Sequence, residues 1–363
     1  NLKNPHDILV LNDASDDGTD EWLDSLKDPN IIVHHNPGPD RIGIVGMFDK
    51  GIEMARTEII MAFHADMIAG PNLDLHTLRH LERGTVVTAT RVEPSLHPPG
   101  PEKIMRDWGV EVEEVDMDRM FADLEQLEGM HPGKITEGVF APWCMYKEDF
   151  LAVDGHDDLF APQSKEDSDI FNRFLQMGYE FKQPWDALVY HFTSRGSRFN
   201  KHAGGAAGQN SEEWLYTTNK NMRNFIRKWG SVVKHDPLMK PIVDPKYDIG
   251  VVLKNSQDVQ LIEALEPWCS NIYVDESRSK YITLEQPNTI MNLQERVLPY
   301  DNEKQNGVLV EIDARQFNQD DFQHLMQLSL IIDAQAKDED LEGAEFELGN
   351  MSIKIITLKD HTA

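Results

Sequence analysis

The side chains of this chain best suited to chemistry follow short apolar runs. The segment IIMAFHAD ends in His64 and Asp66, and the segment DALVYH ends in His191. Carboxylate and imidazole groups both ligate divalent ions such as Mn²⁺. The pattern therefore predicts metal ligands at strand ends, although each histidine could equally be a structural residue hydrogen-bonded to a neighbour.

Two further groups of polar residues stand at the ends of apolar or helical segments. Asn12 and Asp13 end the apolar segment DILVLND, and Glu166, Asp167 and Asp169 open a helical segment in KEDSD. A carboxylate in the first turn of a helix can act as a general base. The helix dipole also favours acids there, so ordinary helix-terminal residues remain an alternative.

The elements that must position these residues alternate between strand and helix. Short apolar runs predict strands, and runs with apolar residues at helical spacing predict helices. This order is typical of a mostly parallel sheet covered by helices, which binds ligands at the carboxyl ends of its strands. The expected strands are residues 7–13, 30–36, 57–66, 85–92 and 185–192, and the expected helices are residues 19–26, 42–55, 165–177 and 212–229.

The chain is long enough for two domains. We predict a first domain over residues 1–231, a Pro-punctuated linker over 232–246 and a small α/β domain over 247–363. NIYVDESR in the second domain parallels ILVLNDAS in the first, and VLVEIDARQFNQDDFQHL parallels IIMAFHADMIAGPNLDLH. A degenerate half-repeat is one interpretation, and an unrelated α/β domain is the other.

Composition limits the partners. The 63 acidic and 35 basic residues give a formal net charge of −28, which disfavours nucleic acid and anionic membrane surfaces. An acidic protein that binds a phosphorylated ligand needs help from a cation. No apolar run reaches the roughly 18 residues of a spanning helix, so no transmembrane segment is expected. Cys144 and Cys269 have no metal-ligand spacing and favour a reducing compartment, the cytoplasm.

Taken together, these segments resemble family 2 glycosyltransferases of the GT-A fold. ILVLNDASDDGTDEWL is similar to the family's VVDDGSTDGT element, and HAD stands where the family carries DxD. VDGHDDLF resembles its Gly-Phe-Asp-Glu segment, and KEDSDIFNRFLQMGYEFKQPWDALVYHF resembles its GEDxDLxxRL stretch and the strand that follows. The resemblance spans residues 7–230 and implies a GT-A-type Rossmann-like α/β fold.

The resemblance implies an inverting, metal-dependent transfer of a sugar, of hexosyltransferase type. The donor would be a UDP-, GDP- or dTDP-sugar and the acceptor a glycan or another hydroxyl compound. Asp66, with His64 and His191, would bind Mn²⁺ or Mg²⁺. Asp167 would be the general base, and Glu166 would position the acceptor.

The resemblance also assigns binding residues. Asn12 and Asp13 would contact the nucleotide, and the basic loop with Arg195 and Arg198 would close over the diphosphate. Trp143, Asp157 and Asp158 would line the acceptor side, although Trp143 could equally belong to the core. The oligomeric state stays open, with a homo-oligomer among the possibilities.

Three features depart from the family pattern. His64 replaces the first acid of DxD, Asn12 replaces an acid, and the family's usual first strand is missing from this sequence. Residues 249–253 have the composition to fill that strand position. A non-catalytic GT-A-like protein that binds nucleotide-sugar or glycan, or a nucleotidyltransferase, would also fit these features.

Overall fold

The structure, a computed structural model, describes residues 2–193 and 209–358 and divides into two compact units. Unit 1 comprises Asn1–Thr218 and Lys234–Ile242, and unit 2 comprises Asn219–Val233 and Val243–Ala363. The boundary falls inside helix α7 (Glu212–Trp229) rather than at residue 231. The second half of α7 belongs to unit 2 because Arg223 and Arg227 pair with acids of that unit.

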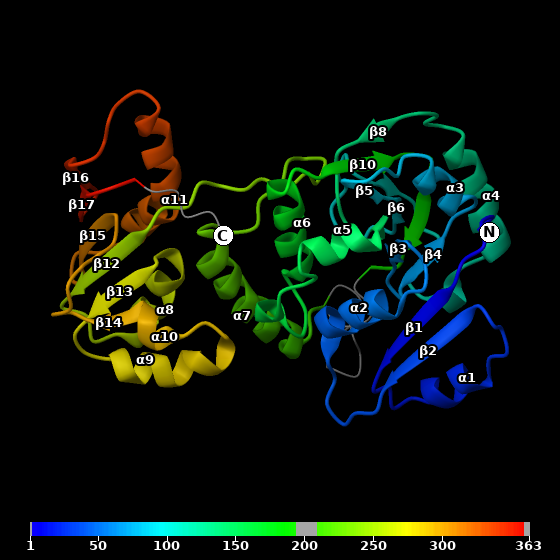
Figure 1. The fold of residues 1–363 in the computed structure, drawn as a ribbon, viewed down its shortest axis with the longest axis horizontal. Coiled ribbons are helices and arrows are strands. Elements are labelled where there is room, and N and C mark those ends of the chain that lie inside the picture. Colours follow the sequence, from blue (N-terminus) through cyan, green and yellow to red (C-terminus); the bar gives the residue numbers. More distant parts are fainter. Residues whose placement is uncertain (1, 194–208, 359–363) are drawn as a thin grey trace. The chain divides into compact units, whose positions relative to one another are not determined.

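Unit 1 begins with the predicted alternation of strands and helices (Figure 1). Its first elements are β1 (Ile8–Asp13), α1 (Thr19–Ser25), β2 (Ile31–Asn36), α2 (Gly43–Met54), β3 (Ile59–Ala62), β4 (Met67–Ala69) and α3 (Leu73–Leu78). Strands β5 (Thr85–Thr88), β6 (Thr90–Glu93) and β7 (Ile104–Met105) follow, then η1 (Val112–Glu114), α4 (Met117–Glu128) and β8 (Ile135–Thr136). The unit continues with β9 (Trp143–Tyr146), α5 (Lys147–Ala152), η2 (Asp158–Phe160), α6 (Glu166–Gln176), β10 (Glu180–Pro184) and β11 (Leu188–His191).

The described strands of unit 1 form three sheets. Strands β1 and β2 pair in parallel, a five-stranded sheet has the order β3-β9-β5-β10-β8, and a four-stranded sheet has the order β4-β11-β6-β7. Strand β3 pairs antiparallel with β9 instead of joining β1 and β2 in one parallel sheet, as the alternation had suggested. The predicted strand over residues 85–92 breaks at Ala89, which places β5 and β6 in different sheets.

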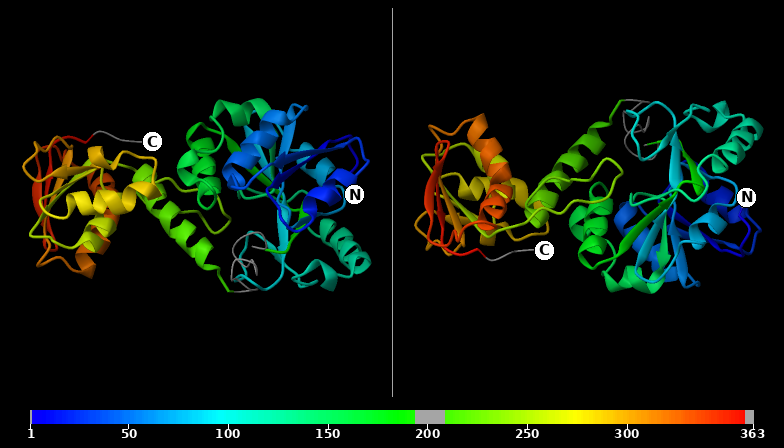
Figure 2. Two further views of the ribbon diagram at one scale, coloured as in Figure 1. Left: turned by 90° about the horizontal axis from the view of Figure 1, so that it is seen from below. Right: turned by 90° about the horizontal axis from the view of Figure 1, so that it is seen from above.

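Unit 2 is an α/β unit built around one six-stranded sheet of order β14-β13-β12-β15-β17-β16. The four strands from β14 to β15 are parallel, and β17 and β16 are antiparallel. Helices pack against this sheet (Figure 2). Its elements are β12 (Ile249–Lys254), α8 (Val259–Leu265), η4 (Glu266–Trp268), β13 (Asn271–Val274), α9 (Arg278–Glu285), η5 (Gln286–Asn288), α10 (Leu293–Arg296), β14 (Val297–Pro299), β15 (Val308–Asp313), α11 (Gln319–Ala336), β16 (Glu345–Leu348) and β17 (Met351–Ile355).

The predicted α/β class is confirmed in both units, but one proposed strand placement is wrong. Ile249–Lys254 is β12, which hydrogen-bonds to β13 on one side and to β15 on the other. Both of its edges are therefore occupied within unit 2, and it cannot fill a strand position beside β1.

Each unit has its own apolar core. In unit 1 the core packs β3, β5 and β9 against α5 and α6, and in unit 2 it packs the six-stranded sheet against α8 and α11. Cys144 and Cys269 are buried in these cores as free thiols. Within the described ranges, no helix combines the length and apolarity needed to cross a membrane.

Candidate active site

Asp66 and His191 meet on neighbouring strands of the four-stranded sheet. Asp66 immediately precedes β4, which pairs antiparallel with β11 so that Met67 lies opposite His191. The Phe192 amide donates to the Asp66 carbonyl at 3.0 Å, which fixes the two strand ends together. The His191 Nε2 and Asp66 Oδ2 atoms lie 3.5 Å apart. The two side chains predicted to bind metal are thus brought together.

Glu93, which the sequence reasoning missed, holds the other side of His191. The His191 Nδ1 lies 2.8 Å from the Glu93 Oε1, and the Lys103 Nζ and Arg91 Nη1 lie 2.9 and 3.1 Å from the Glu93 carboxylate. Burial alone would raise the pKa of Glu93. The hydrogen bond from His191 and the nearby cations outweigh burial and lower the pKa to about 2.

His64 interacts electrostatically with Asp66, Asp167 and His191. Its ring stacks on Phe48 with the centroids 5.5 Å apart. Burial lowers the pKa of His64, against the opposing effect of the Asp167 and Asp66 carboxylates. The lowered pKa favours a neutral imidazole at His64, and the charges of both Asp66 and Asp167 act on it.

Helix α6 begins at the predicted acids. Glu166 and Asp167 are its first two residues, preceded by Ser164 and Lys165 with φ of 76° and 77°. Two consecutive residues other than glycine in the left-handed region cost of order 1–3 kcal/mol each, and such strain clusters at functional sites. Asp167 is partly buried, whereas Glu166 is buried with its Oε2 lacking a hydrogen-bond partner.

Glu166 is a buried acid with a raised pKa. Burial, and next the charge of Asp167, raise the pKa of Glu166 to about 8. Glu166 therefore keeps its proton at neutral pH. Its burial also means that Glu166 does not reach an acceptor in this structure, contrary to the prediction that it positions one.

The predicted nucleotide contacts, Asn12 and Asp13, end β1 as expected, but their side chains have partners within unit 1. The Asp13 carboxylate accepts from the Ile42 and Gly43 amides at 2.9 and 2.7 Å, which caps α2. Asn12 is buried and its Oδ1 accepts from the Ser15 hydroxyl at 2.6 Å. Both residues act in this structure as local supports for the end of β1.

The predicted acceptor residues differ in their exposure. Trp143 is 1% exposed and stacks on Phe150 with the ring centroids 5.8 Å apart. Its indole is therefore part of the core and cannot stack on a sugar, which corrects the acceptor role predicted for it. Asp157 caps η2 through the Leu159 amide at 2.9 Å, and Asp158 is exposed at the start of that turn. Arg195 and Arg198 lie outside the described residues.

Thr193, close to His191 in the chain, has a strained backbone conformation. It follows the His191 strand end by two residues and has a φ of 67°, an outlier for a β-branched side chain. The residue is fully buried, and its hydroxyl lacks a hydrogen-bond partner in the described chain. A strained residue with an unsatisfied hydroxyl beside the paired Asp66 and His191 is typical of a functional site.

The side chains at this site supply some of the ligands that a divalent ion needs. Asp66 offers a carboxylate and His191 an imidazole, both of which ligate Mn²⁺. Among the described residues, no group of three or more His, Cys, Asp or Glu side chains could by itself hold a metal ion. Two protein donors with the remaining positions left to phosphate oxygens and water is a usual arrangement for ions that bind together with a nucleotide.

The family model described as glycosyl transferase family 2 matches residues 2–128, which include β1, His64, Asp66 and Glu93. Residues 2–128 belong to glycosyl transferase family 2. The resemblance drawn from the motifs is confirmed for this family 2 segment, and the α/β fold agrees with it.

Other comparisons add little to that match. No curated protein matches the chain in sequence. Similar solved structures include the crystal structure of GalNAc-T7 with UDP, GalNAc and Mn²⁺, at 13% sequence identity and a TM-score of 0.41. That similarity covers 61% of this chain and 42% of the GalNAc-T7 chain, so this chain spans less than half of that protein.

Proposed function

We propose that unit 1 is a metal-dependent, inverting glycosyltransferase that moves a sugar from a nucleoside diphosphate donor to an acceptor hydroxyl. The observation that supports the proposal is that Asp66 lies 3.5 Å from His191 and that the charges of Asp66 and Asp167 both act on His64, with His64 and Asp66 inside the segment that matches glycosyl transferase family 2. These residues come from three separate stretches of the sequence.

The donor end of the site is assigned to Asp66 and His191. A divalent ion held by these residues would neutralise the diphosphate and stabilise the negative charge of the leaving nucleotide. This requirement is acute for a chain with a formal net charge of −28, which would otherwise repel its donor. UDP-, GDP- and dTDP-sugars are the donor classes to be tested.

The base is assigned to Asp167. In an inverting transfer, the acceptor oxygen attacks the anomeric carbon and loses its proton as the bond from that carbon to the phosphate oxygen breaks. Asp167 receives the proton. Glu166, which precedes it in the chain and is buried and neutral, acts through Asp167 rather than by touching the acceptor.

A binding protein without catalysis is the second candidate. It is favoured by the engagement of Asp13 and Asn12 within unit 1, since a donor must then be held by fewer direct contacts. Such a protein would bind a nucleotide-sugar with Mn²⁺ and release no free nucleotide.

The test is nucleotide release from a panel of UDP-, GDP- and dTDP-sugars with Mn²⁺, Mg²⁺ or a chelator. We expect one donor to be turned over only with metal, and Asp167→Asn to lower the rate about 10²–10⁴-fold with donor binding retained. Asp118→Asn, a change of the same chemistry at an exposed position of α4, serves as the matched control. Donor binding without release in the wild-type protein would favour the binding protein, and neither binding nor release would exclude both.

A further inference from the structure

We infer that Glu93 is a positioning residue that orients the imidazole of His191 so that its Nε2 faces Asp66. The inference rests on the proposed cation site and deepens it. It concerns a residue that no motif suggested, on a strand that precedes His191 by almost one hundred residues in the sequence.

The sheet itself brings the residues into a row. In the order β4-β11-β6-β7, Asp66 precedes β4, His191 ends β11 and Glu93 ends β6, and the Lys103 side chain reaches Glu93 from the residue before β7. Strands β11 and β6 are parallel with Tyr190 opposite Val92, so the next residues along, His191 and Glu93, are also neighbours. Strand pairing rather than chance side-chain reach therefore sets their contact.

The chemistry of the contact fixes the tautomer of His191. An ionised carboxylate only accepts hydrogen bonds, so the His191 Nδ1, 2.8 Å from Glu93, must carry the hydrogen. In a neutral imidazole the Nε2 then has a lone pair, directed to the side where the Asp66 Oδ2 lies 3.5 Å away. A lone pair and a carboxylate oxygen that converge in this way are a donor pair for a cation.

Glu93 is itself held in place. It is 1% exposed, and its carboxylate binds the Lys103 Nζ through Oε2 and the Arg91 Nη1 through Oε1. Arg91 also stacks over the Phe140 ring at 3.9 Å. A carboxylate fixed by two cations has no freedom to release His191, and carboxylates that orient a ligating histidine commonly add 10–100-fold to metal affinity.

The alternative is that Glu93 is only the anionic partner of Lys103 and Arg91 in a buried ion-pair cluster. Glu102 allows the two roles to be separated. Its carboxylate lies 3.8 Å from Arg91 and 3.9 Å from Lys103, so it belongs to the same cluster, but it has no contact with His191. A purely structural role would affect the stability of the protein in both variants, and would not change the tautomer of His191.

The experiment measures the His191 tautomer by ¹⁵N NMR of histidine-labelled protein, and Mn²⁺ affinity with UDP present by EPR titration. We expect the Nδ1–H tautomer in the wild-type protein, a mixture in Glu93→Gln, and a 10–100-fold loss of Mn²⁺ affinity in that variant. Glu102→Gln should keep the wild-type tautomer and bind Mn²⁺ within about threefold of the wild-type affinity.

Each outcome decides a separate point. An Nε2–H tautomer in the wild-type protein would overturn the inference, even if Glu93→Gln failed to fold. Equal Mn²⁺ affinity in Glu93→Gln and the wild-type protein would overturn it as well. If the wild-type protein shows the Nδ1–H tautomer but binds no Mn²⁺ with any nucleotide, the orientation of His191 stands and the proposed metal dependence fails.

Discussion

One strand in each unit ends in polar residues, but the carboxylates at these two strand ends have different partners. In the half-repeat interpretation, residues 59–66 of unit 1, IIMAFHAD, align with residues 308–315 of unit 2, VLVEIDAR, so that His64 and Asp66 align with Asp313 and Arg315. Asp66 faces an imidazole on a neighbouring strand. Asp313 instead pairs with Arg315 two residues away, through Nε at 3.0 Å, and with Asn255 at 3.1 Å.

The difference shows what a strand end needs in order to serve as a cation site. Arg315, and also Asn255, hold the pKa of Asp313 well below its usual range, so this carboxylate already has its counter-charge. In unit 1 the Asp66 carboxylate lies beside the imidazole of His191. We propose that unit 2 is a degenerate GT-A-like half-repeat without the metal chemistry.

The largest expected effect contrasts these two strand ends. Asp66→Asn should lower donor turnover at least 100-fold, because it removes the carboxylate donor of the proposed ion. Asp313→Asn should leave turnover unchanged, since the Asp313 carboxylate is engaged by Arg315 and Asn255. Nucleotide release measured side by side checks both, and an equal loss in the two variants would contradict the assignment of the chemistry to unit 1.

Sequence reasoning succeeded where the pattern was local. The bounds of β1, α6 and α7 were predicted within one residue, because apolar periodicity and helix-terminal acids determine such elements from neighbouring residues. Asp66 and His191 were both recognised as residues at strand ends, but their contact depends on the antiparallel pairing of β4 with β11.

The contacts that could not be predicted from the sequence depend on how distant segments pair and pack. Glu93 follows TVVTATRV in a Pro-rich context, and only the pairing of β6 with β11 places it beside His191. Trp143 lies in an apolar run that is compatible both with a core position and with a sugar-binding surface. Only its contact with Phe150 in the structure shows that it belongs to the core. The capping of α2 by Asp13 joins residues about thirty positions apart, which no short motif records.

The next expected effect concerns buried charge in unit 2. The Arg227 guanidinium is completely buried and binds Glu266 at 2.7 Å and Glu285 at 2.8 Å. Arg227→Met should lower the free energy of unfolding of unit 2 by about 3–5 kcal/mol, because two buried carboxylates lose a partner. Urea unfolding followed by intrinsic fluorescence checks this. Lys337→Met, at an exposed ion pair with Asp333 on α11, is the control and should have no measurable effect.

A smaller effect, dependent on pH, is expected from Glu166 in unit 1. Its pKa is raised in the folded state to about 8, against an ordinary value of 4.5 in the unfolded chain. The folded state therefore binds the proton more tightly, and this contribution to stability is complete below pH 4.5 and is lost as the pH rises towards 8. One pKa unit corresponds to about 1.4 kcal/mol, so the loss amounts to a few kcal/mol.

Glu166→Gln mimics the protonated acid and should remove that dependence. The free energy of unfolding, measured by urea titration at pH 5 and pH 8, should fall less between the two values in Glu166→Gln than in the wild-type protein. Glu148→Gln, at an exposed acid of α5, is the control. Equal slopes in the wild-type protein and Glu166→Gln would mean that Glu166 is already ionised in the fold.

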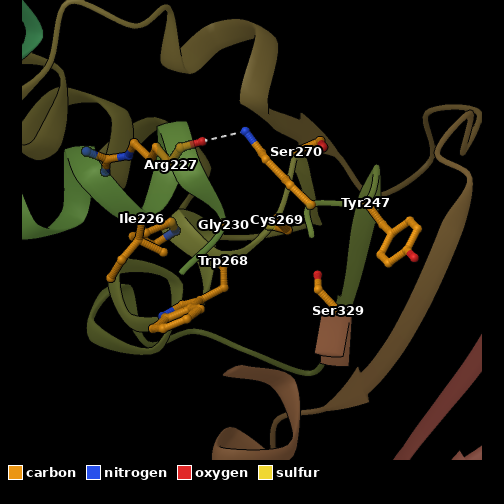
Figure 3. Close-up of a pocket in the computed structure, with 10 residues that line it drawn as sticks. Ile226, Arg227, Gly230, Tyr247, Trp268, Cys269, Ser270 and Ser329 are labelled. Atoms are coloured by element: carbon orange, nitrogen blue, oxygen red, sulfur yellow. Dashed lines mark hydrogen bonds between the residues drawn. The ribbon is translucent and has the colours of Figure 1, made fainter. Parts of the chain in front are cut away.

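The smallest effect has the opposite sign and lies in unit 2, where Lys246 closes the end of α7. Its Nζ donates to the carbonyls of Arg227 and Lys228 at 3.0 and 2.7 Å, beside a pocket lined by Tyr247, Trp268 and Ser329 (Figure 3). Burial, and then the charges of Arg296 and Lys228, lower the pKa of Lys246 to about 8, against a weaker opposing effect of Asp248.

The unfolded chain therefore binds this proton more tightly than the fold does. The stability of unit 2 should rise as the pH increases from 8 towards 10.5, since the neutral amine avoids the cost of a buried charge and still has two hydrogens for the two carbonyls. Lys246→Met lacks the titrating group but leaves both carbonyls without a donor. The stability difference between wild type and Lys246→Met should therefore widen between pH 7.5 and pH 10. A difference that stays constant would mean that the ammonium is solvated, and that Lys246 acts only as a cap for α7.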